Sequence, residues 1–483
     1  MMLAQRIQKH LSTAYENRLL IRDLDSFAAV IDYERLLGEL GYPVIFYGDA
    51  EQFRYRYETE FKDADMRLAV IADGSCYVPY DIRQSFYERP LSLEVLYPKL
   101  NAAVLRRHLS DLDLIDCAYD TLYQDALSIG QAEQFIAQSA WSAENIRRFL
   151  SSAEGTLHCA AGRAVTFSDW VHVAQLNAKL AVYAASVGLE RSQQAINDAF
   201  SSFIGSGYSR LSGHVSTRSP VILPKVMDWI GGEKTAFIVA DGMSMFDFEI
   251  LSRYFSDFDL ECSGVFALIP TTTSISRQSL LSGKYPRQLA RPFSLANEKS
   301  EFLKAAAARG LKEHQCFYGQ GCEVLPGPLV RLAAIILRDV DDIVHGQRQG
   351  RQGMYHDISL LAKSGKIQNL ILPLLRRGFQ VYLLSDHGNT CCTGIGSAPR
   401  VGVETETKSR RMLVLKDFAQ IPAELSDKTF LYPGYYLDKS YQYVICKDST
   451  SFDRKNETVM THGGITIEEV IVPFVRIRRK QNG

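Results

Sequence analysis

Two carboxylates in the second half of the chain follow apolar runs that have the composition of buried strands. The run TAFIVA ends at Asp241-Gly242, and the run FQVYLLS ends at Asp386-His387-Gly388. Acidic and imidazole groups at the end of a buried strand need a polar partner, because burying an unpaired charge is costly. A metal ion would be such a partner. The alternatives are that Asp241 caps the next helix and that Asp386 and His387 lie in a solvated loop.

A second set of metal-binding side chains is predicted further along the chain. In the string LRDVDDIVHG, Asp341 and His345 are four residues apart, and on a helix this spacing puts both on one face, where they could share a metal. The string THGG offers another imidazole, His462, and its glycines allow the backbone to approach a site closely. Three alternatives remain open: an exposed ion pair, a role for Asp339 in place of Asp341, and a solvated His462.

Three consecutive threonines, Thr271, Thr272 and Thr273, follow Pro270 and directly precede a predicted helix. Unpaired N–H groups and the helix dipole favour anions at such a position. A hydroxyl there could act as a nucleophile if a metal lowered its pKa. The alternative is an ordinary threonine cap at the start of the helix.

Together these motifs supply three carboxylates, three imidazoles and a hydroxyl, mostly at strand ends. This set suits two divalent metal ions, each with nitrogen and oxygen ligands and an open position. Because no thiolate belongs to the set, zinc is the expected metal and manganese is the alternative.

The elements that must position these residues are predicted as short apolar strands alternating with helices. Strands are expected at 235–240, 265–269, 380–384, 412–415 and 470–475. Such alternation is typical of a mixed or mostly parallel sheet covered by helices, in which functional groups gather beyond the carboxyl ends of the strands. The predicted fold class is therefore α/β, with a mixed sheet sandwiched by helices in the C-terminal part.

Four regions are predicted along the chain. Residues 1–125 are expected to form a small α/β domain, because the apolar run RLAVIAD ends in a turn at Asp73-Gly74. Residues 126–210 have helical periodicity without clustered chemistry, which favours a spacer or docking region. Residues 211–232 form the predicted linker, since residues 205–224 are rich in Gly, Ser and Pro, and 233–483 are the predicted catalytic domain.

Bulk composition limits the classes of partner. The 483 residues carry 54 basic and 55 acidic side chains, for a formal net charge of −1, so no global positive field attracts nucleic acid. Nine scattered cysteines without zinc-ribbon spacing indicate a reducing compartment. No secretion signal and no run of 18 apolar residues is recognisable, so a cytoplasmic protein without membrane contact is expected.

The motifs occur in an order that resembles the alkaline phosphatase superfamily. The order is Asp-Gly, P-x-x-Thr, Asp-x-x-x-His, Asp-His-Gly and His-Gly-Gly, and within that superfamily the details resemble the PglZ domain. The supporting strings are IVADGMS, PTTTSISRQSLLSG, VDDIVH, LLSDHG and THGGITIEEVIVP. The resemblance covers about residues 235–478, roughly half of the chain.

The resemblance implies a role for each residue of the site. It assigns three ligands to a metal beside the nucleophile and three to a second metal: Asp241, Asp386 and His387 for the first, and Asp341, His345 and His462 for the second. The nucleophile falls on Thr273, the third residue after the proline, although the run of threonines also permits Thr271 or Thr272. Arg277, one helical turn further on, could contact phosphate oxygens or pair with an acid on the surface.

The implied activity is hydrolysis of phosphate esters through a covalent phospho-threonine, by a two-metal phosphatase or phosphodiesterase. The substrate would be a phosphate ester or phosphodiester, including a nucleotide or nucleic acid. PglZ proteins belong to bacterial BREX and Pgl anti-phage systems, so the implied partners are other defence subunits, including a DNA methyltransferase. Two alternatives remain: another reaction of the superfamily, and an assembly subunit in which the metals are structural.

Overall fold

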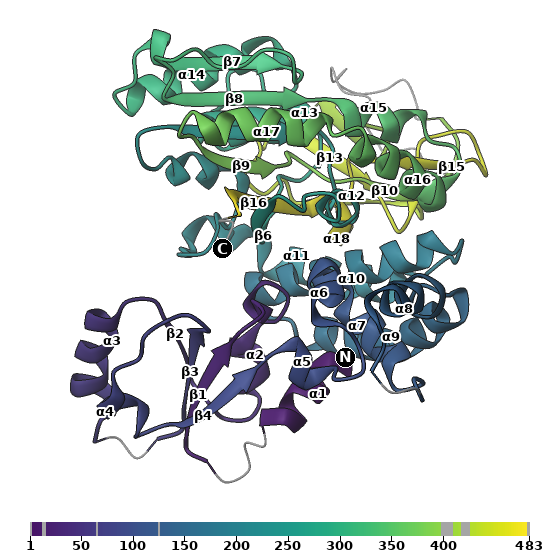
Figure 1. Cartoon of the computed structure of the whole chain (residues 1–483). Coiled ribbons are helices and arrows are strands. Elements are labelled where there is room, and N and C mark those ends of the chain that lie inside the picture. The colour runs from purple at the N-terminus through teal and green to yellow at the C-terminus, as the bar shows by residue number, and fades with distance from the viewer. Residues whose placement is uncertain are drawn as a thin grey trace. The chain divides into compact units, whose positions relative to one another are not determined.

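The computed structural model describes residues 2–11, 16–63, 66–123, 126–397, 409–416 and 426–480 (Figure 1). The chain forms two compact units, Met1–Glu154 and Gly155–Gly483. The division falls within helix α9 (Ala143–Arg163). The four regions expected along the sequence stay a prediction.

The first unit is built on a parallel four-stranded sheet in the order β2-β3-β1-β4. Its strands are β1 (Arg18–Asp23), β2 (Val44–Tyr47), β3 (Leu68–Asp73) and β4 (Tyr87–Leu91). Alternate residues of each strand face opposite sides of the sheet. In β1 and β3, Leu19, Ile21, Ala69 and Ile71 therefore belong to one buried cluster, whereas Leu20, Leu68, Val70 and Ala72 belong to another.

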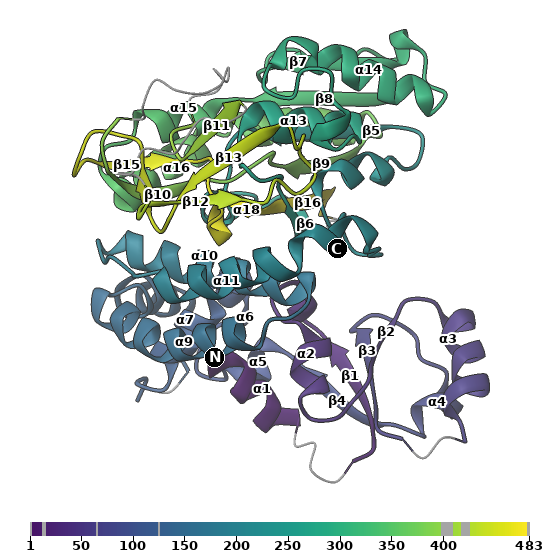
Figure 2. The same ribbon diagram turned by 180° about the vertical axis from the view of Figure 1, so that it is seen from behind.

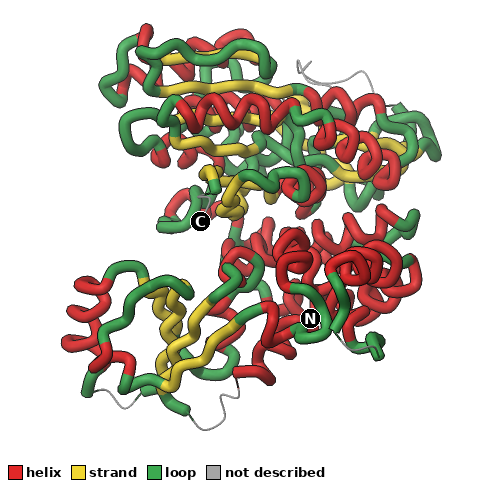
Figure 3. Tube along the Cα trace, viewed as in Figure 1, coloured by secondary structure: helices red, strands yellow, loops and turns green. Residues whose placement is uncertain are grey.

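Helices cover both faces of this sheet and continue as a helical segment after it (Figure 3). The elements around the sheet are α1 (Met2–Leu11), η2 (Phe27–Ala29), α2 (Tyr33–Gly38), α3 (Ala50–Arg56), the π-helix η3 (Tyr57–Phe61) and α4 (Tyr80–Arg83). Those after it are α5 (Leu93–Leu96), α6 (Ala102–Leu105), η4 (Arg106–Asp111), α7 (Leu112–Tyr119), α8 (Ile129–Phe135) and the π-helix η5 (Ile136–Ala140).

A mixed six-stranded sheet in the order β6-β16-β9-β5-β8-β7 forms the centre of the second unit. The strands are β5 (Thr235–Ala240), β6 (Phe258–Phe266), β7 (Cys316–Gln320), β8 (Leu332–Leu337), β9 (Gln380–Leu384) and β16 (Ile471–Arg479). The pairs β5·β8, β5·β9 and β7·β8 are parallel, and β16 is antiparallel to both β6 and β9. This arrangement confirms the predicted α/β class.

Two hydrophobic cores lie on the two faces of this sheet. Ile238 of β5 and Ile335 of β8 enter one core with helices α10, α12, α16 and α17. Their neighbours Val239 and Ile336 enter the other core with α13 and α14. The strands are thus buried on both sides, which explains why they are apolar along their whole length.

The helices of the second unit precede its central sheet or connect the strands of that sheet. They are α10 (Phe167–Ser186), α11 (Gln194–Ser206), α12 (Met245–Ser252), α13 (Thr273–Ser282), α14 (Glu298–Ala308), α15 (Asp339–Gly346), α16 (Gly350–Lys363), α17 (Lys366–Arg376) and α18 (Ile467–Val470). Short 3₁₀ segments are η6 (Tyr208–Gly213), η7 (Leu223–Trp229), η8 (Pro286–Gln288), η9 (Leu295–Asn297) and η10 (Glu313–Gln315). Among the described residues, no helix is long and apolar enough to cross a membrane.

Two small sheets lie between β9 and β16 in the chain (Figure 2). One has the order β14-β10-β15, with β10 (Thr390–Gly394), β14 (Thr450–Ser451) and β15 (Thr458–Thr461). The other is antiparallel with the order β11-β13-β12, formed by β11 (Met412–Lys416), β12 (Thr429–Tyr432) and β13 (Tyr441–Cys446). Strand β15 leads directly to His462.

Gly388 provides a test of the packing between the end of β9 and α18. A Cβ atom at Gly388 would lie 1.9 Å from the carbonyl oxygen of Glu468, so backbone would have to move. We expect Gly388→Ala to lower the free energy of unfolding by about 1–3 kcal/mol, as overpacking does, in urea denaturation. Gly162→Ala is the control, since its Cβ meets nothing within 4 Å. Equal stability of the two variants would contradict this packing.

Candidate active site

The predicted site residues come together at one edge of the six-stranded sheet. Asp241 directly follows β5, Asp386 lies just beyond the end of β9, and the helix that carries Asp341 begins just beyond the end of β8; all three strands are parallel. Strand β16 runs in the opposite direction, so its beginning lies at the same edge. The threonines after β6 and the histidine after β15 therefore meet the strand-end carboxylates, as expected for a sheet of this kind.

Asp241, Asp386 and His387 form the first group of side chains, and all three are buried. His387 Nε2 lies 3.7 Å from Asp241 Oδ1 and 4.0 Å from Asp386 Oδ2. Asp386 Oδ1 also accepts a hydrogen bond of 3.2 Å from the backbone N–H of Gly242. Asp241 does not cap the next helix, because Ser244 caps α12.

The orientation of the His387 ring follows from its second nitrogen. Nδ1 lies 3.0 Å from the carbonyl oxygen of Gly388, which can only accept, so Nδ1 carries the proton. The lone pair on Nε2 consequently faces Thr273, whose hydroxyl oxygen is 3.0 Å away. The nitrogen that a metal would use is thus directed at the predicted nucleophile.

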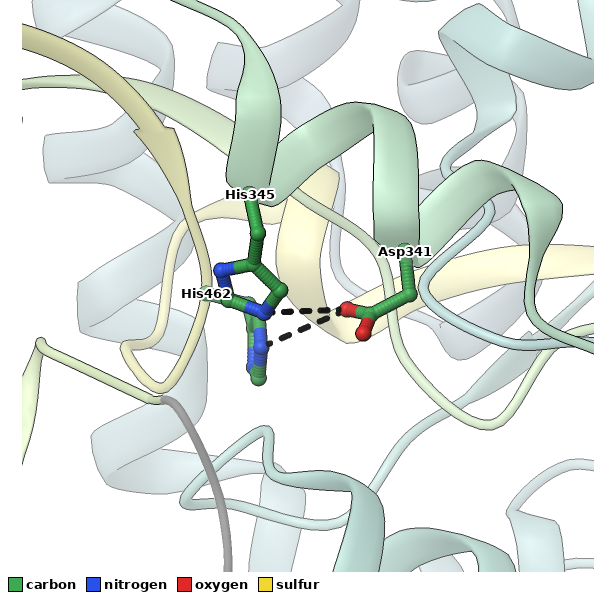
Figure 4. Close-up of side chains that lie close together, drawn as sticks. All are labelled: Asp341, His345 and His462. Atoms are coloured by element: carbon green, nitrogen blue, oxygen red, sulfur yellow. Dashed lines mark ion pairs between the residues drawn. The ribbon is translucent and has the colours of Figure 1, made fainter.

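The second group consists of Asp341, His345 and His462 (Figure 4). The Nε2 atoms of His345 and His462 lie 3.2 and 3.8 Å from Asp341 Oδ1. Asp341 and His345 share one face of α15, as their spacing predicts. Asp339 instead forms an ion pair with Lys366, which leaves Asp341 as the carboxylate of this group.

The two groups adjoin through their imidazoles. The rings of His387 and His462 are stacked with their centroids 4.1 Å apart. His345 contacts His462 edge to face, at 5.3 Å. Six side chains from four segments of the chain therefore form one continuous site.

Each group fits a divalent cation by its donor atoms. The ligand atoms within each group lie within 4.8 Å of one another, and carboxylate oxygens with imidazole nitrogens are typical ligands of zinc and manganese. Buried polar atoms are rarely left without a partner. Yet in the part of the chain that the structure describes, Asp386 Oδ2 and His462 Nε2 are buried and have no hydrogen-bond partner.

The pKa values of the site indicate that its buried carboxylates have too little positive charge beside them. Burial and the neighbouring Asp386 raise the pKa of Asp241 to about 8, although Arg277 opposes the shift. Burial also raises the pKa of Asp386 to about 6. Burial and His387 lower the pKa of His462 to about 3, so its imidazole is neutral at pH 7. Burial opposes ionisation of Asp341, but His345 and His462 lower its pKa below the usual range.

The three threonines have different surroundings. Thr273 is the first residue of α13, and its hydroxyl lies 3.5 Å from Asp241 Oδ1 and 3.0 Å from His387 Nε2. Thr271 uses its hydroxyl in two backbone hydrogen bonds, to Gly463 and Gly464. Thr272 occupies the N-cap position but makes no side-chain cap bond. Only Thr273 among them directs its hydroxyl at the carboxylate and imidazole of the first group.

Arg277 is buried and forms an ion pair with a carboxylate on either side. Its Nη1 donates to Asp241 Oδ2 at 2.5 Å, and its Nε donates to Glu298 Oε2 at 2.8 Å. Tyr318 donates a hydrogen bond to the other oxygen of Glu298. The pairing expected from the sequence thus occurs in the interior, where it holds one oxygen of Asp241 away from the first group.

Several residues that support the site were not predicted from the sequence. Asn389 donates to the carbonyl of Gly242 at 2.9 Å and to Asp247 at 2.6 Å, and so ties the loops after β5 and β9 together. Glu469 accepts from the N–H of Gly464 at 2.7 Å and is paired with Arg411. Asn389 lies two residues after His387, and Glu469 lies within the string THGGITIEEVIVP, whereas Glu298 and Arg411 lie outside every motif.

Comparison with solved structures finds enzymes that resemble this chain distantly. Murine ectonucleotide pyrophosphatase/phosphodiesterase 5 is 12% identical, with a TM-score of 0.35 over 50% of this chain and 88% of its own. The human protein of that name is 12% identical, with a TM-score of 0.34 over 51% and 89%. Phosphonoacetate hydrolase from Sinorhizobium meliloti 1021, in complex with phosphonoformate, is 10% identical, with a TM-score of 0.32 over 52% and 91%.

A sequence comparison with curated proteins finds no match. Residues 225–477 match the family described as the BREX system PglZ alkaline phosphatase-like domain. The matched segment is just over half of the 483 residues and contains every predicted site residue. The resemblance seen in the motifs is therefore confirmed, and the chain belongs to the PglZ family of alkaline phosphatase-like domains.

Proposed function

We propose that this chain is a two-metal phosphatase or phosphodiesterase that hydrolyses phosphate esters through Thr273. Membership of an alkaline phosphatase-like family supports a phosphoester hydrolase. The observation that carries the finer assignment is the position of the Thr273 hydroxyl. It lies at the start of a ten-residue helix, 3.0 Å from His387 Nε2 and 3.5 Å from Asp241 Oδ1.

Asp241, Asp386 and His387 would hold one metal, and Asp341, His345 and His462 would hold the second. Zinc is the proposed metal, with manganese as the alternative, because all six ligands donate nitrogen or oxygen. Divalent ions in paired sites stabilise negative charge on the attacking and leaving oxygens of a phosphoryl transfer.

The residues of the chain carry out the other steps of the reaction. Thr273 Oγ1 attacks phosphorus and forms a new P–O bond, while the bond to the leaving oxygen breaks and the threonine proton passes to that oxygen in the net balance. Water then cleaves the phospho-threonine, which restores the hydroxyl and releases phosphate from a monoester substrate or a phosphomonoester from a diester substrate. N–H groups in the first turn of α13 favour the phosphoryl anion throughout, and Arg277 orients Asp241.

We further propose that the reaction serves a BREX-type anti-phage system in the cytoplasm, beside other defence subunits including a DNA methyltransferase. The support is the description of the family. The substrate would be a nucleotide, a nucleic acid or another phosphate ester. In a host that carries the complete system, Thr273→Val should reduce protection against phage, whereas full protection by a hydrolytically dead variant would point to an assembly role.

Replacement of the proposed nucleophile tests the reaction. We expect Thr273→Val to lower hydrolysis of bis-p-nitrophenyl phosphate and p-nitrophenyl phosphate by about 10³-fold or more, as loss of a nucleophile does. Metal content, measured by inductively coupled plasma mass spectrometry, should stay at two ions per chain. Thr273→Ser keeps a hydroxyl and should retain activity. Full activity of Thr273→Val would exclude this nucleophile, and two bound ions without hydrolysis by the wild type would favour structural metals.

Metal affinity should depend on pH through the first group. In the metal-free protein, Asp386 and Asp241 hold protons up to pH values of about 6 and 8, and a metal must displace those protons. Affinity should therefore rise between pH 6 and 8, by up to about tenfold per pH unit for each proton released, in zinc titrations. Asp386→Asn should flatten this dependence, and an equal affinity at pH 6 and pH 8 in the wild type would contradict it.

The same two carboxyls predict the pH dependence of stability without metal. Their folded pKa values lie above the value of about 4 for an unfolded aspartate, so the folded state binds more protons than the unfolded state between pH 4 and 8. The contribution of these two carboxyls to the free energy of unfolding of the metal-free protein should consequently fall as the pH rises through that range. Urea denaturation in a chelating buffer measures this pH dependence, and comparison with Asp386→Asn isolates the contribution of the carboxyls. A contribution of the opposite sign would refute the raised pKa values.

A further inference from the structure

Thr271 joins two segments of the chain that are distant in sequence. It is fully buried, and its Oγ1 accepts the N–H of Gly463 at 3.0 Å and donates to the carbonyl of Gly464 at 3.0 Å. A threonine hydroxyl can donate and accept at the same time, which an aliphatic side chain of equal shape cannot do. The hydroxyl therefore fixes the backbone immediately after His462.

The main chain of Thr271 contacts the imidazole itself. His462 Nδ1 lies 3.0 Å from the carbonyl oxygen of Thr271. Because a carbonyl oxygen only accepts, Nδ1 must carry the proton, and Nε2 has the free lone pair. That lone pair faces Asp341, whose Oδ1 is 3.8 Å away.

The loop around His462 is also held from its other side. Ser409 Oγ donates to the carbonyl oxygen of His462 at 2.9 Å. Gly463 has a φ of +115°, and a Cβ there would lie 1.8 Å from Ser409 Oγ. Position 463 thus has no room for a side chain, so the anchors of this loop must come from residues such as Thr271 and Ser409.

We propose that Thr271 is a positioning residue that holds His462 in the tautomer and orientation needed to bind the second metal. This rests on the proposed two-metal function. The hydroxyl of Thr271 fixes the position of residues 270–273 relative to the loop after β15. The carbonyl of Thr271 then fixes the orientation of the His462 ring. Partners that orient a metal-bound histidine in this way typically contribute 10- to 100-fold to metal affinity.

Thr272 provides a matched control, one residue away in the same run. Its side chain is also fully buried, but its Oγ1 has no hydrogen-bond partner among the residues that the structure describes. Valine has nearly the same shape as threonine, so Thr272→Val removes a buried hydroxyl without breaking a hydrogen bond. The run of three threonines then contains a positioning residue, an inert neighbour and the proposed nucleophile.

The test is a zinc titration of the full chain against a chromophoric chelator, with both dissociation constants resolved. We expect Thr271→Val to weaken one of the two sites by about 10- to 100-fold and to leave the other unchanged. His345→Ala, which removes a ligand of the second group, identifies the affected site. Thr271→Ser and Thr272→Val should bind both ions within about threefold of the wild type, a margin well below the 10-fold effect of losing an orienting partner.

Two results of this titration would overturn the proposal. The first is unchanged affinity at both sites in Thr271→Val, and the second is an equal loss in Thr272→Val. If Thr271→Val unfolds and loses both ions, Thr271→Ser decides, because loss of the second ion in a folded variant that keeps the hydroxyl would also refute the assignment.

A measurement on the metal-free protein separates this proposal from the proposed function. In ¹⁵N-histidine-labelled wild type, long-range ¹H–¹⁵N spectra should show His462 with the proton on Nδ1, and Thr271→Val should lose this single tautomer. A proton on Nε2 in the wild type would overturn the role of Thr271 whether or not the chain binds metal. Absence of metal binding with the expected tautomer would instead refute the proposed function alone.

Discussion

The enclosed negative charge of Asp241 and Asp386 imposes the main electrostatic demand on this fold. Two carboxylates at neighbouring strand ends repel each other, and burial removes the water that would stabilise them. One cation from the chain, Arg277, is buried beside Asp241 and is itself shared with Glu298. The imidazole of His462, whose pKa burial lowers to about 3, adds no positive charge at pH 7. At this edge of the sheet, the strand ends and the stacked imidazole rings surround two carboxylates whose negative charge the protein alone does not fully balance.

The near-copy of the Asp241 motif in the first unit shows what burial adds to a sequence pattern. Asp73 is the last residue of the parallel strand β3 and precedes a glycine. It is exposed, however, and hydrogen bonds from the backbone and side chain of Ser75 lower its pKa. Asp241 has the same local sequence but lies beside a second carboxylate in the interior. The chemistry of the motif therefore comes from its neighbours in space and not from its own three residues.

This contrast explains which parts of the fold and of the site could be predicted from the sequence. Strand β5, strand β9 and the helical spacing of Asp341 and His345 have strong local signatures, and the structure contains all of them. Strand β8 was not predicted, because a six-residue apolar run such as LAAIIL also fits a buried helix. Strand β6 ends at Phe266 rather than continuing to Ile269.

The supporting residues were harder to foresee for a physical reason. Glu298 and Arg411 act through partners that are distant in the chain, Arg277 and Glu469. Neither hydrophobic periodicity nor turn preference predicts such a contact. The motif order favoured Thr273 among the three threonines, but their residue types alone did not separate them, because only tertiary contacts give each hydroxyl a different partner. Local patterns predict which segments reach the edge of the sheet, whereas packing decides what each side chain does there.

The second group of ligands has a mechanical consequence. Asp341 and His462 are more than a hundred residues apart in the chain, and the insertion that carries β11, β12 and β13 lies within the loop they would close. An ion bound by both would act as a removable cross-link, and closing long loops restricts the unfolded chain most. Chelating agents would then do more than abolish activity. They would also remove this cross-link, and strands β11, β12 and β13 would become more open to proteases.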